Sequence, residues 1–213
     1  MLVGIALGIA LLIKTFLVQA FVIPSGSMEP TIQVDDRVLV NKFTPWFGWE
    51  PDRGDVVVFK DPGGWLETES GPPRAGDPPV IGELKTALSW IGLLPKEDED
   101  LIKRVVGVGG DSVVCCDEAG SVTVNGVPVA EPYVHAGNEP STIPFDVTVP
   151  QDHVFVMGDH RSNSADSRFH LDGPAGGSVP VDLVVGRAGV IAWPYAHWGR
   201  LGGSGVFDTV PEP

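Results

Sequence analysis

Short runs of β-branched and aromatic residues, nearly all bounded by turn residues, recur along this chain of 213 residues. Runs of this length and composition are typical of β-strands. Asn125-Gly126, between Val122–Val124 and Val127–Val129, predicts a hairpin, because a type I′ turn needs positive φ at both central positions. We therefore expect a mainly β domain, with strands at Arg37–Phe43, Asp55–Lys60, Ile102–Val106, Ser112–Cys115, Val122–Val124 and His153–Met157.

The N-terminal segment has a different pattern. From Met1 to Phe21 the only charged side chain is Lys14, and this length approaches the roughly 20 residues that cross a bilayer core as a helix. A lysine at the bilayer centre costs about 2.5 to 3.5 kcal/mol, so Lys14 is expected near the outer interface. The apolar run before Lys14 is then short for a full span. Either the helix tilts and thins the bilayer, or the natural start of the chain lies upstream of Met1. We predict a transmembrane anchor over residues 1–22 and one β-rich domain over residues 23–213.

A cleavable signal peptide is the alternative interpretation of this segment, because Val18-Gln19-Ala20 ends in a small residue. The segment lacks a basic region at its start, and Lys14 interrupts its apolar core. Both features favour the retained anchor.

Residues 61–100 interrupt the strand pattern. The stretch begins with proline, glycine and acidic residues, and then places apolar residues at helical spacing. We interpret it as an insertion with one short amphipathic helix that packs on the parent domain, with lipid or a partner as alternative contacts. The apolar residues are Ile81, Leu84, Ala87, Leu88, Ile91 and Leu94.

Three further features bear on partners. Acidic residues number 28 against 14 basic ones, and a negative surface repels phosphate backbones, so nucleic acid is not an expected partner. The adjacent Cys115 and Cys116 match no metal-ligand spacing; two thiols are favoured over a vicinal or intermolecular disulfide. Trp46, Phe47 and Trp49 crowd one turn, where they either contact the membrane interface or pack in the core.

Ser27 stands in a turn, Pro24-Ser25-Gly26-Ser27-Met28, that leaves a hydroxyl accessible to a peptide backbone. A serine hydroxyl is a poor nucleophile unless a base accepts its proton. The five histidines stand in no recognisable triad setting, and the Gly-x-Ser-x-Gly elbow is absent. Another residue must therefore supply the base.

Lys103 is the better candidate because it interrupts an apolar run, Leu101-Ile102-Lys103-Arg104-Val105-Val106. Strand alternation sends Lys103 and Arg104 to opposite faces, so one of the two should point inward. The free pKa of lysine, near 10.4, keeps it charged at neutral pH, and burial among apolar groups can lower that pKa by up to about 3 to 5 units. An inward Lys103 is expected to become a competent base.

A polar stretch from Gly158 to Arg168, Gly-Asp-His-Arg-Ser-Asn-Ser-Ala-Asp-Ser-Arg, completes the pattern. Its short polar side chains can bond nearby backbone and build a rigid loop. A carboxylate touching Lys103 would hold the amine protonated, so Asp166 is expected to pair with Arg168. Ser164 can then be the neutral partner of the lysine.

From about Thr15 to Trp193 these segments resemble the motif boxes of type I signal peptidases, membrane-anchored serine-lysine endopeptidases that remove signal peptides. The resemblance implies Ser27 as nucleophile, Lys103 as base, and an oxyanion hole formed by the Ser27 amide and the Ser25 hydroxyl. Such donors are worth about 3 to 4 kcal/mol each in related chemistry. Residues 53–59 match a structural strand of the family.

The resemblance also assigns supporting and substrate-binding residues. Ser164 would orient the lysine, and Asp166, Arg168 and Asp159 would support the site. The extended substrate would add beside strands near Ile23 and Ile102, and small pockets would favour an Ala-x-Ala pattern before the cut. Ser162 and His170 depart from the residues usual in the family, which leaves the loop in doubt but not the dyad. The expected substrate-binding residues are Ile23, Pro24, Met28 and Ile102.

The expectation is thus a mainly β signal-peptidase/LexA-like domain on the extracytoplasmic side of the cell membrane, held by a single span and monomeric. Its partners are signal-peptide-bearing preproteins and the lipid bilayer; the reaction needs no metal or cofactor. A LexA-like self-cleaving protein uses the same dyad but needs a DNA-binding domain where this chain has the apolar segment. A non-catalytic anchored module would not need Ser27 and Lys103 together.

Overall fold

The computed structural model describes residues 18–42, 49–66, 100–173, 175–202 and 205–213. Residues 1–17 of the expected anchor, the helix expected within residues 81–94, and Trp46 and Phe47 lie outside the described residues. Within the described ranges, no helix is both long enough and apolar enough to cross a membrane.

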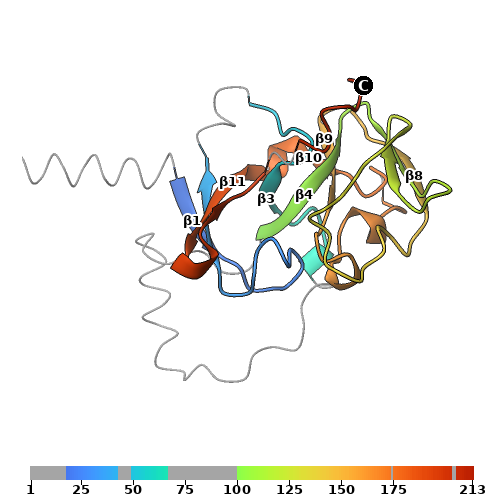
Figure 1. Cartoon of the computed structure of the whole chain (residues 1–213). Coiled ribbons are helices and arrows are strands. Elements are labelled where there is room, and N and C mark those ends of the chain that lie inside the picture. The colour runs from blue at the N-terminus through green and yellow to red at the C-terminus, as the bar shows by residue number, and fades with distance from the viewer. Residues whose placement is uncertain (1–17, 43–48, 67–99, 174, 203–204) are drawn as a thin grey trace, which may run out of the picture.

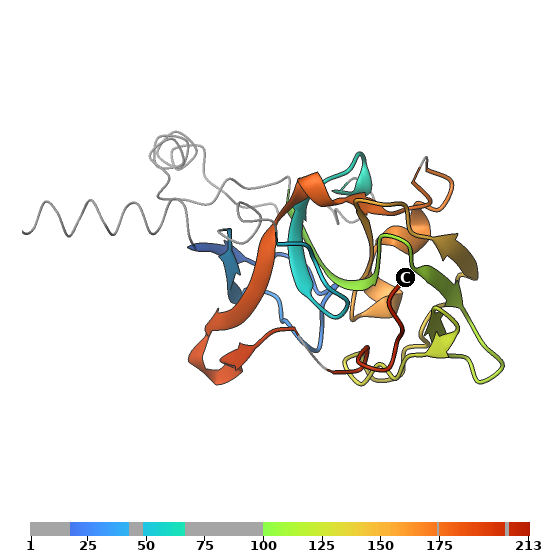
Figure 2. The ribbon, with the colours of Figure 1, turned by 90° about the horizontal axis from the view of Figure 1, so that it is seen from above.

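An eight-stranded antiparallel sheet forms the larger part of the molecule. The sheet is strongly curled in the two views of Figures 1 and 2, and β11 and β4 are themselves curved strands. Strand β12 (Gly199–Arg200) pairs with β11 outside the main order. The main order is β1 (Val18–Val22), β2 (Arg37–Asn41), β11 (Val184–Trp193), β3 (Val56–Lys60), β4 (Asp100–Val108), β9 (His153–Met157) and β10 (Val179–Pro180).

A smaller antiparallel sheet lies at the far side of the molecule from β1 (Figure 1). Asn125 and Gly126 have φ angles of 51° and 77°, which confirms the predicted hairpin turn. Four short 3₁₀ helices complete the described elements: η2 (Arg161–Asn163), η3 (Ser167–Phe169), η4 (Val181–Leu183) and η5 (Tyr195–His197). The order of the smaller sheet is β7 (Val127–Pro128), β6 (Val122–Val124), β5 (Ser112–Cys115) and β8 (Phe145–Thr148).

All six strands predicted from the sequence are present, with small differences at their ends. The expected end of the anchor at residue 22 was wrong, because Val18–Val22 form β1 and pair in full with β2. Strand β11, which the sequence analysis missed, lies at the centre of the large sheet between β2 and β3.

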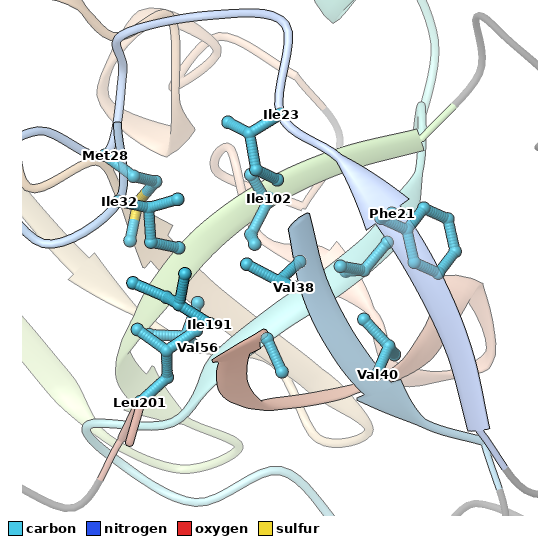
Figure 3. Close-up of a cluster of buried hydrophobic side chains, with 12 residues drawn as sticks. Phe21, Ile23, Met28, Ile32, Val38, Val40, Val56, Ile102, Ile191 and Leu201 are labelled. Carbon is cyan, nitrogen blue, oxygen red and sulfur yellow. The ribbon is translucent and has the colours of Figure 1, made fainter. Parts of the chain in front are cut away.

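Three apolar clusters hold the two sheets. The first joins β1, β2, β3, β4 and β11 with the turn that carries Ser27, and includes Met28 and Ile32 (Figure 3). The second packs the small sheet against Phe155, Met157 and the C-terminal Phe207. The third covers the other face of β3 and β4, so that β4 is apolar-packed on both sides.

The sequence left alternative interpretations open for Trp49 and for the two adjacent cysteines. Trp49 is partly buried and packs against the third cluster, as the core interpretation of that residue expected. Cys115 and Cys116 are joined in a vicinal disulfide at the end of β5, so the favoured interpretation of two thiols was wrong.

Candidate active site

The turn that follows β1 presents Ser27. The Glu29 amide donates to the Gly26 carbonyl at 3.1 Å, and the Ile32 amide donates to the Met28 carbonyl at 2.9 Å. Met28 and Ile32 are fully buried in the first apolar cluster, where Figure 3 shows both side chains. Apolar anchoring on one side of the turn thus fixes the position of Ser27.

Lys103 lies on β4 and reaches this turn from the sheet. Its Nζ donates a hydrogen bond to Ser27 Oγ at 2.8 Å, although 76 residues separate the two in the chain. Both residues are 1% exposed, so the expectation that the turn leaves the Ser27 hydroxyl accessible was wrong for this structure. The Ser25 and Ser27 hydroxyl oxygens lie 3.2 Å apart. The structure therefore brings together the two residues predicted as nucleophile and base, with Ser25 beside them.

Arg104 is buried as well, at 3% exposed, so the expectation that only one of Lys103 and Arg104 points inward was wrong. Both faces of β4 are covered, and the arginine is accommodated by polar partners. It donates to both carboxylate oxygens of Asp159, at 2.8 and 2.6 Å, and to the Gly54 carbonyl at 3.0 Å. Its guanidinium also lies 4.0 Å from the ring centre of Tyr133.

Burial alone lowers the pKa of the Arg104 guanidinium, but the hydrogen bonds and charge of Asp159 outweigh burial and leave this pKa raised. The arginine therefore stays charged, and its partner Asp159 is fully buried. Asp159, predicted as a supporting residue, is tied to β4 by this contact and also accepts from the Thr31 hydroxyl.

The expected pair of Asp166 and Arg168 is present. Arg168 Nε and Nη2 each donate to a different oxygen of Asp166 at 2.8 Å. The same carboxylate accepts from the Gly158 amide at 2.9 Å, and Arg168 also donates to the Arg161 carbonyl at 2.9 Å. Asp166 thus bonds Arg168 and the loop backbone, as expected from the argument that a carboxylate touching Lys103 would keep the amine protonated.

Ser164 is buried, and in the described part of the chain its hydroxyl has no hydrogen-bond partner. It lies close to Gly158, where an added Cβ would overlap Ser164 Oγ and the Ser27 carbonyl. Only glycine fits at this close approach. The role of Ser164 in orienting Lys103 stays a prediction.

A further ion pair was missed by sequence reasoning. Arg161 donates to both carboxylate oxygens of Glu131, at 2.9 and 2.6 Å, and to the Pro140 and Gly158 carbonyls. The Arg161 position within the polar stretch was a signal, whereas nothing in the sequence singles out Glu131. This pair fastens the loop before β8 to the site.

Of the four expected substrate-binding residues, Met28 has a side chain that is fully buried in the core. Ile23 and Ile102 are buried in the same cluster, and the Ile23 amide and carbonyl already bond Asp36 and Asp35. Pro24 is exposed. Direct substrate contact by Ile23, Pro24, Met28 and Ile102 stays a prediction.

Strand β4 has an open side next to the dyad. It pairs with β3 from Asp100 onward, but with β9 only from Arg104 onward. On that side, no strand of the described residues lies beside Leu101 and Ile102. An extended peptide can therefore add to the sheet at this point.

Comparison with known proteins places this chain in a family. Residues 1–193 match the family model described as signal peptidase, peptidase S26. The chain is 39% identical to a probable signal peptidase I from Mycobacterium leprae, over 93% of this chain and 76% of the relative. It is 41% identical to a signal peptidase I from Mycobacterium tuberculosis, over 87% and 68% of the two chains.

A signal peptidase I from Leptolyngbya laminosa is 34% identical, over 94% of this chain and 81% of the relative. The chain belongs to the signal peptidase family S26. It is a serine endopeptidase that removes signal peptides from preproteins. The LexA-like and non-catalytic interpretations are thereby set aside.

Proposed function

We propose that Ser27 and Lys103 are the catalytic dyad of this peptidase and act through an acyl-enzyme. One observation carries this proposal: the buried Lys103 Nζ lies 2.8 Å from Ser27 Oγ. That distance is within reach for direct proton transfer between a nucleophile and its base.

In the first step, Ser27 Oγ attacks the scissile carbonyl carbon while its proton passes to the Lys103 amine. The resulting ammonium gives the proton to the leaving nitrogen as the peptide bond breaks, which leaves the substrate acyl group on Ser27. Water then attacks this ester, its proton passes to Lys103, and Ser27 Oγ leaves and regains a proton. Lys103 acts as base in its neutral form, because only the neutral amine has a lone pair to accept the proton.

The negative oxygen that develops in both steps needs donors. We assign this role to the Ser27 amide and the Ser25 hydroxyl, which stands next to the nucleophile. Asp166, Arg168, Asp159 and Ser164 act as positioning residues through the loop that they build.

The preprotein binds as an extended strand along the open side of β4 beside Leu101 and Ile102. Backbone pairing supplies affinity, and shallow pockets select small residues of the Ala-x-Ala type before the cut. Ile102, a member of the first apolar cluster, would form a pocket wall.

Members of this family are membrane-anchored in bacteria. For this chain we propose a single span in the first residues, with the catalytic domain, a monomer, on the extracytoplasmic side at the bilayer surface. The apolar composition from Met1 onward supports the span, and the start of β1 at Val18 places the sheet directly after it.

The test uses the full chain in detergent with a preprotein substrate, and the new N-terminus of the product is sequenced. Ser27→Ala and Lys103→Met should each lower the cleavage rate by about 10³-fold or more, because the dyad acts as a unit. Ser162→Ala, an exposed serine of the same loop, and Lys60→Met, an exposed strand lysine, serve as matched controls. Cleavage that survives in either dyad variant at a rate near that of its control refutes the assignment.

A further inference from the structure

A cluster of metal-ligating side chains stands beside the nucleophile and has no part in the dyad. Glu29, His135 and His160 each offer one ligand atom, and these atoms all lie within 4.8 Å of one another. The three residues come from three separate segments: the Ser27 turn, the loop after β7, and the polar stretch. Chain folding, and not local sequence, brings them together.

The two imidazole rings are parallel. Their centres are 4.1 Å apart and their planes differ by 7°. Stacking thus holds the imidazoles of two separate segments in direct contact. Neutral rings are the form that binds a metal ion.

Backbone carbonyls prepare each ring for coordination. His135 Nδ1 lies 3.0 Å from the Ala136 carbonyl, and His160 Nδ1 lies 3.2 Å from the Gly26 carbonyl. Since a carbonyl oxygen only accepts, each Nδ1 carries the proton and each Nε2 keeps a lone pair. Metal-bound histidines commonly donate their second nitrogen in this way.

Glu29 supplies the negative charge of the set. Its carboxylate lies 3.7 Å from His160 Nδ1, the nitrogen that donates to the Gly26 carbonyl and not the one left to bind a metal, and its side chain is 32% exposed. The side chain folds back over Gly26, where a Cβ would come within 3.2 Å of the carboxyl carbon. Glycine at position 26 therefore leaves the space that the carboxylate occupies.

We propose that Glu29, His135 and His160 bind a divalent transition-metal ion of the zinc type, and that the bound ion slows cleavage. Two imidazoles and one carboxylate suit Zn²⁺, whereas Mg²⁺ and Ca²⁺ require mostly oxygen ligands. The ion is a regulatory ligand and takes no part in the serine-lysine reaction.

Slower cleavage follows from the contacts of His160. Its amide donates to the Ser27 carbonyl at 3.0 Å, and its ring donates to the Gly26 carbonyl. An ion held by His160 and Glu29 would link Glu29, two residues after the nucleophile, to the histidine that already bonds the Gly26 and Ser27 carbonyls. That turn would then adapt less readily to an acylating substrate.

Binding is tested first, with untagged full-length protein in detergent and Co²⁺ as a spectroscopic probe. The visible absorption of Co²⁺ should appear at one equivalent and should be displaced by Zn²⁺ but not by Mg²⁺. His135→Ala and Glu29→Gln should each weaken binding at least tenfold. His153→Ala is the matched control, because its Nδ1 also faces a carbonyl, that of Gln151, outside the cluster.

Ser27→Ala should bind Co²⁺ as the parent protein does, so the metal site is tested independently of the proposed dyad. Absence of a one-equivalent spectrum, or binding that is equal in His135→Ala and His153→Ala, overturns the site. In the parent protein Zn²⁺ should slow preprotein cleavage reversibly, and Glu29→Gln should reduce this effect. Metal binding without slower cleavage overturns the regulatory half of the proposal.

Discussion

The buried pair of Arg104 and Asp159 offers a stability prediction with a magnitude. Asp159 is fully buried, and it accepts two charged hydrogen bonds from Arg104 and one from the Thr31 hydroxyl. Removing one partner of such a pair leaves an uncompensated buried charge and costs about 3 to 5 kcal/mol. In a protein of this size, each kcal/mol lowers Tm by about 2 to 4 °C. Arg104→Met and Asp159→Leu should therefore each lower Tm by about 6 to 20 °C.

The double variant distinguishes charge burial from simple loss of packing. With both residues replaced, no buried charge is left unpaired. The double variant should therefore lose less free energy of unfolding than the two single variants lose together, by at least about 2 kcal/mol. Thermal unfolding followed by near-ultraviolet circular dichroism measures all three variants. Arg37→Met, on an exposed position at the start of β2, is the control and should change stability by less than about 0.5 kcal/mol. Additive losses, or single losses no larger than that of the control, refute the reasoning.

Three further variants test other parts of the structure. Gly158→Ala should cost about 1 to 3 kcal/mol through overlap beside the nucleophile and lower the cleavage rate, whereas Gly189→Ala, with open space around its Cβ position, should do neither. Burial lowers the pKa of His170 below its unfolded value, so stability should fall as pH drops through about 6.5; in His170→Phe this pH dependence of Tm should be smaller. Gly126→Ala places a side chain at a φ of 77° in the β6–β7 turn and should lower stability by about 1 kcal/mol in chemical denaturation.

The sequence predicted those strands whose apolar runs are continuous and bounded by turns. It missed β11 because Gly186 and Gly189 break the run, and register shifts interrupt its pairing. Gly186 has a structural cause: an added Cβ would overlap the Asn41 carbonyl on the neighbouring strand. Close approach of backbones is a property of the assembled sheet, which no local pattern reveals.

Strand β1 was missed for a different reason. Val18–Val22 continue the apolar composition of the preceding segment without a break, so composition cannot separate a strand from the end of an apolar helix. Its pairing with β2 decides the matter.

At the site, the contact between Ser27 and Lys103 and the Asp166–Arg168 pair were predictable because each member stands in a distinctive local segment. The partners of Arg104 and Arg161 were not, since Asp159 and Glu131 lie 55 and 30 residues away in the chain. Burial of both faces of β4 was equally hidden, because alternation predicts opposite directions but not what covers each face.

The arginine pairs bear directly on the proposed role of Lys103 as a base. A carboxylate without a cation near the dyad would favour the charged form of the lysine and so remove the base. Arginine prevents this better than lysine could, because its fork binds both carboxylate oxygens and it stays charged at every pH at which the enzyme could work. The paired arginines also donate to backbone carbonyls, and Asp166 accepts from the Gly158 amide, so that these pairs hold the backbone around Ser27. These three acid–arginine pairs are Asp159–Arg104, Asp166–Arg168 and Glu131–Arg161.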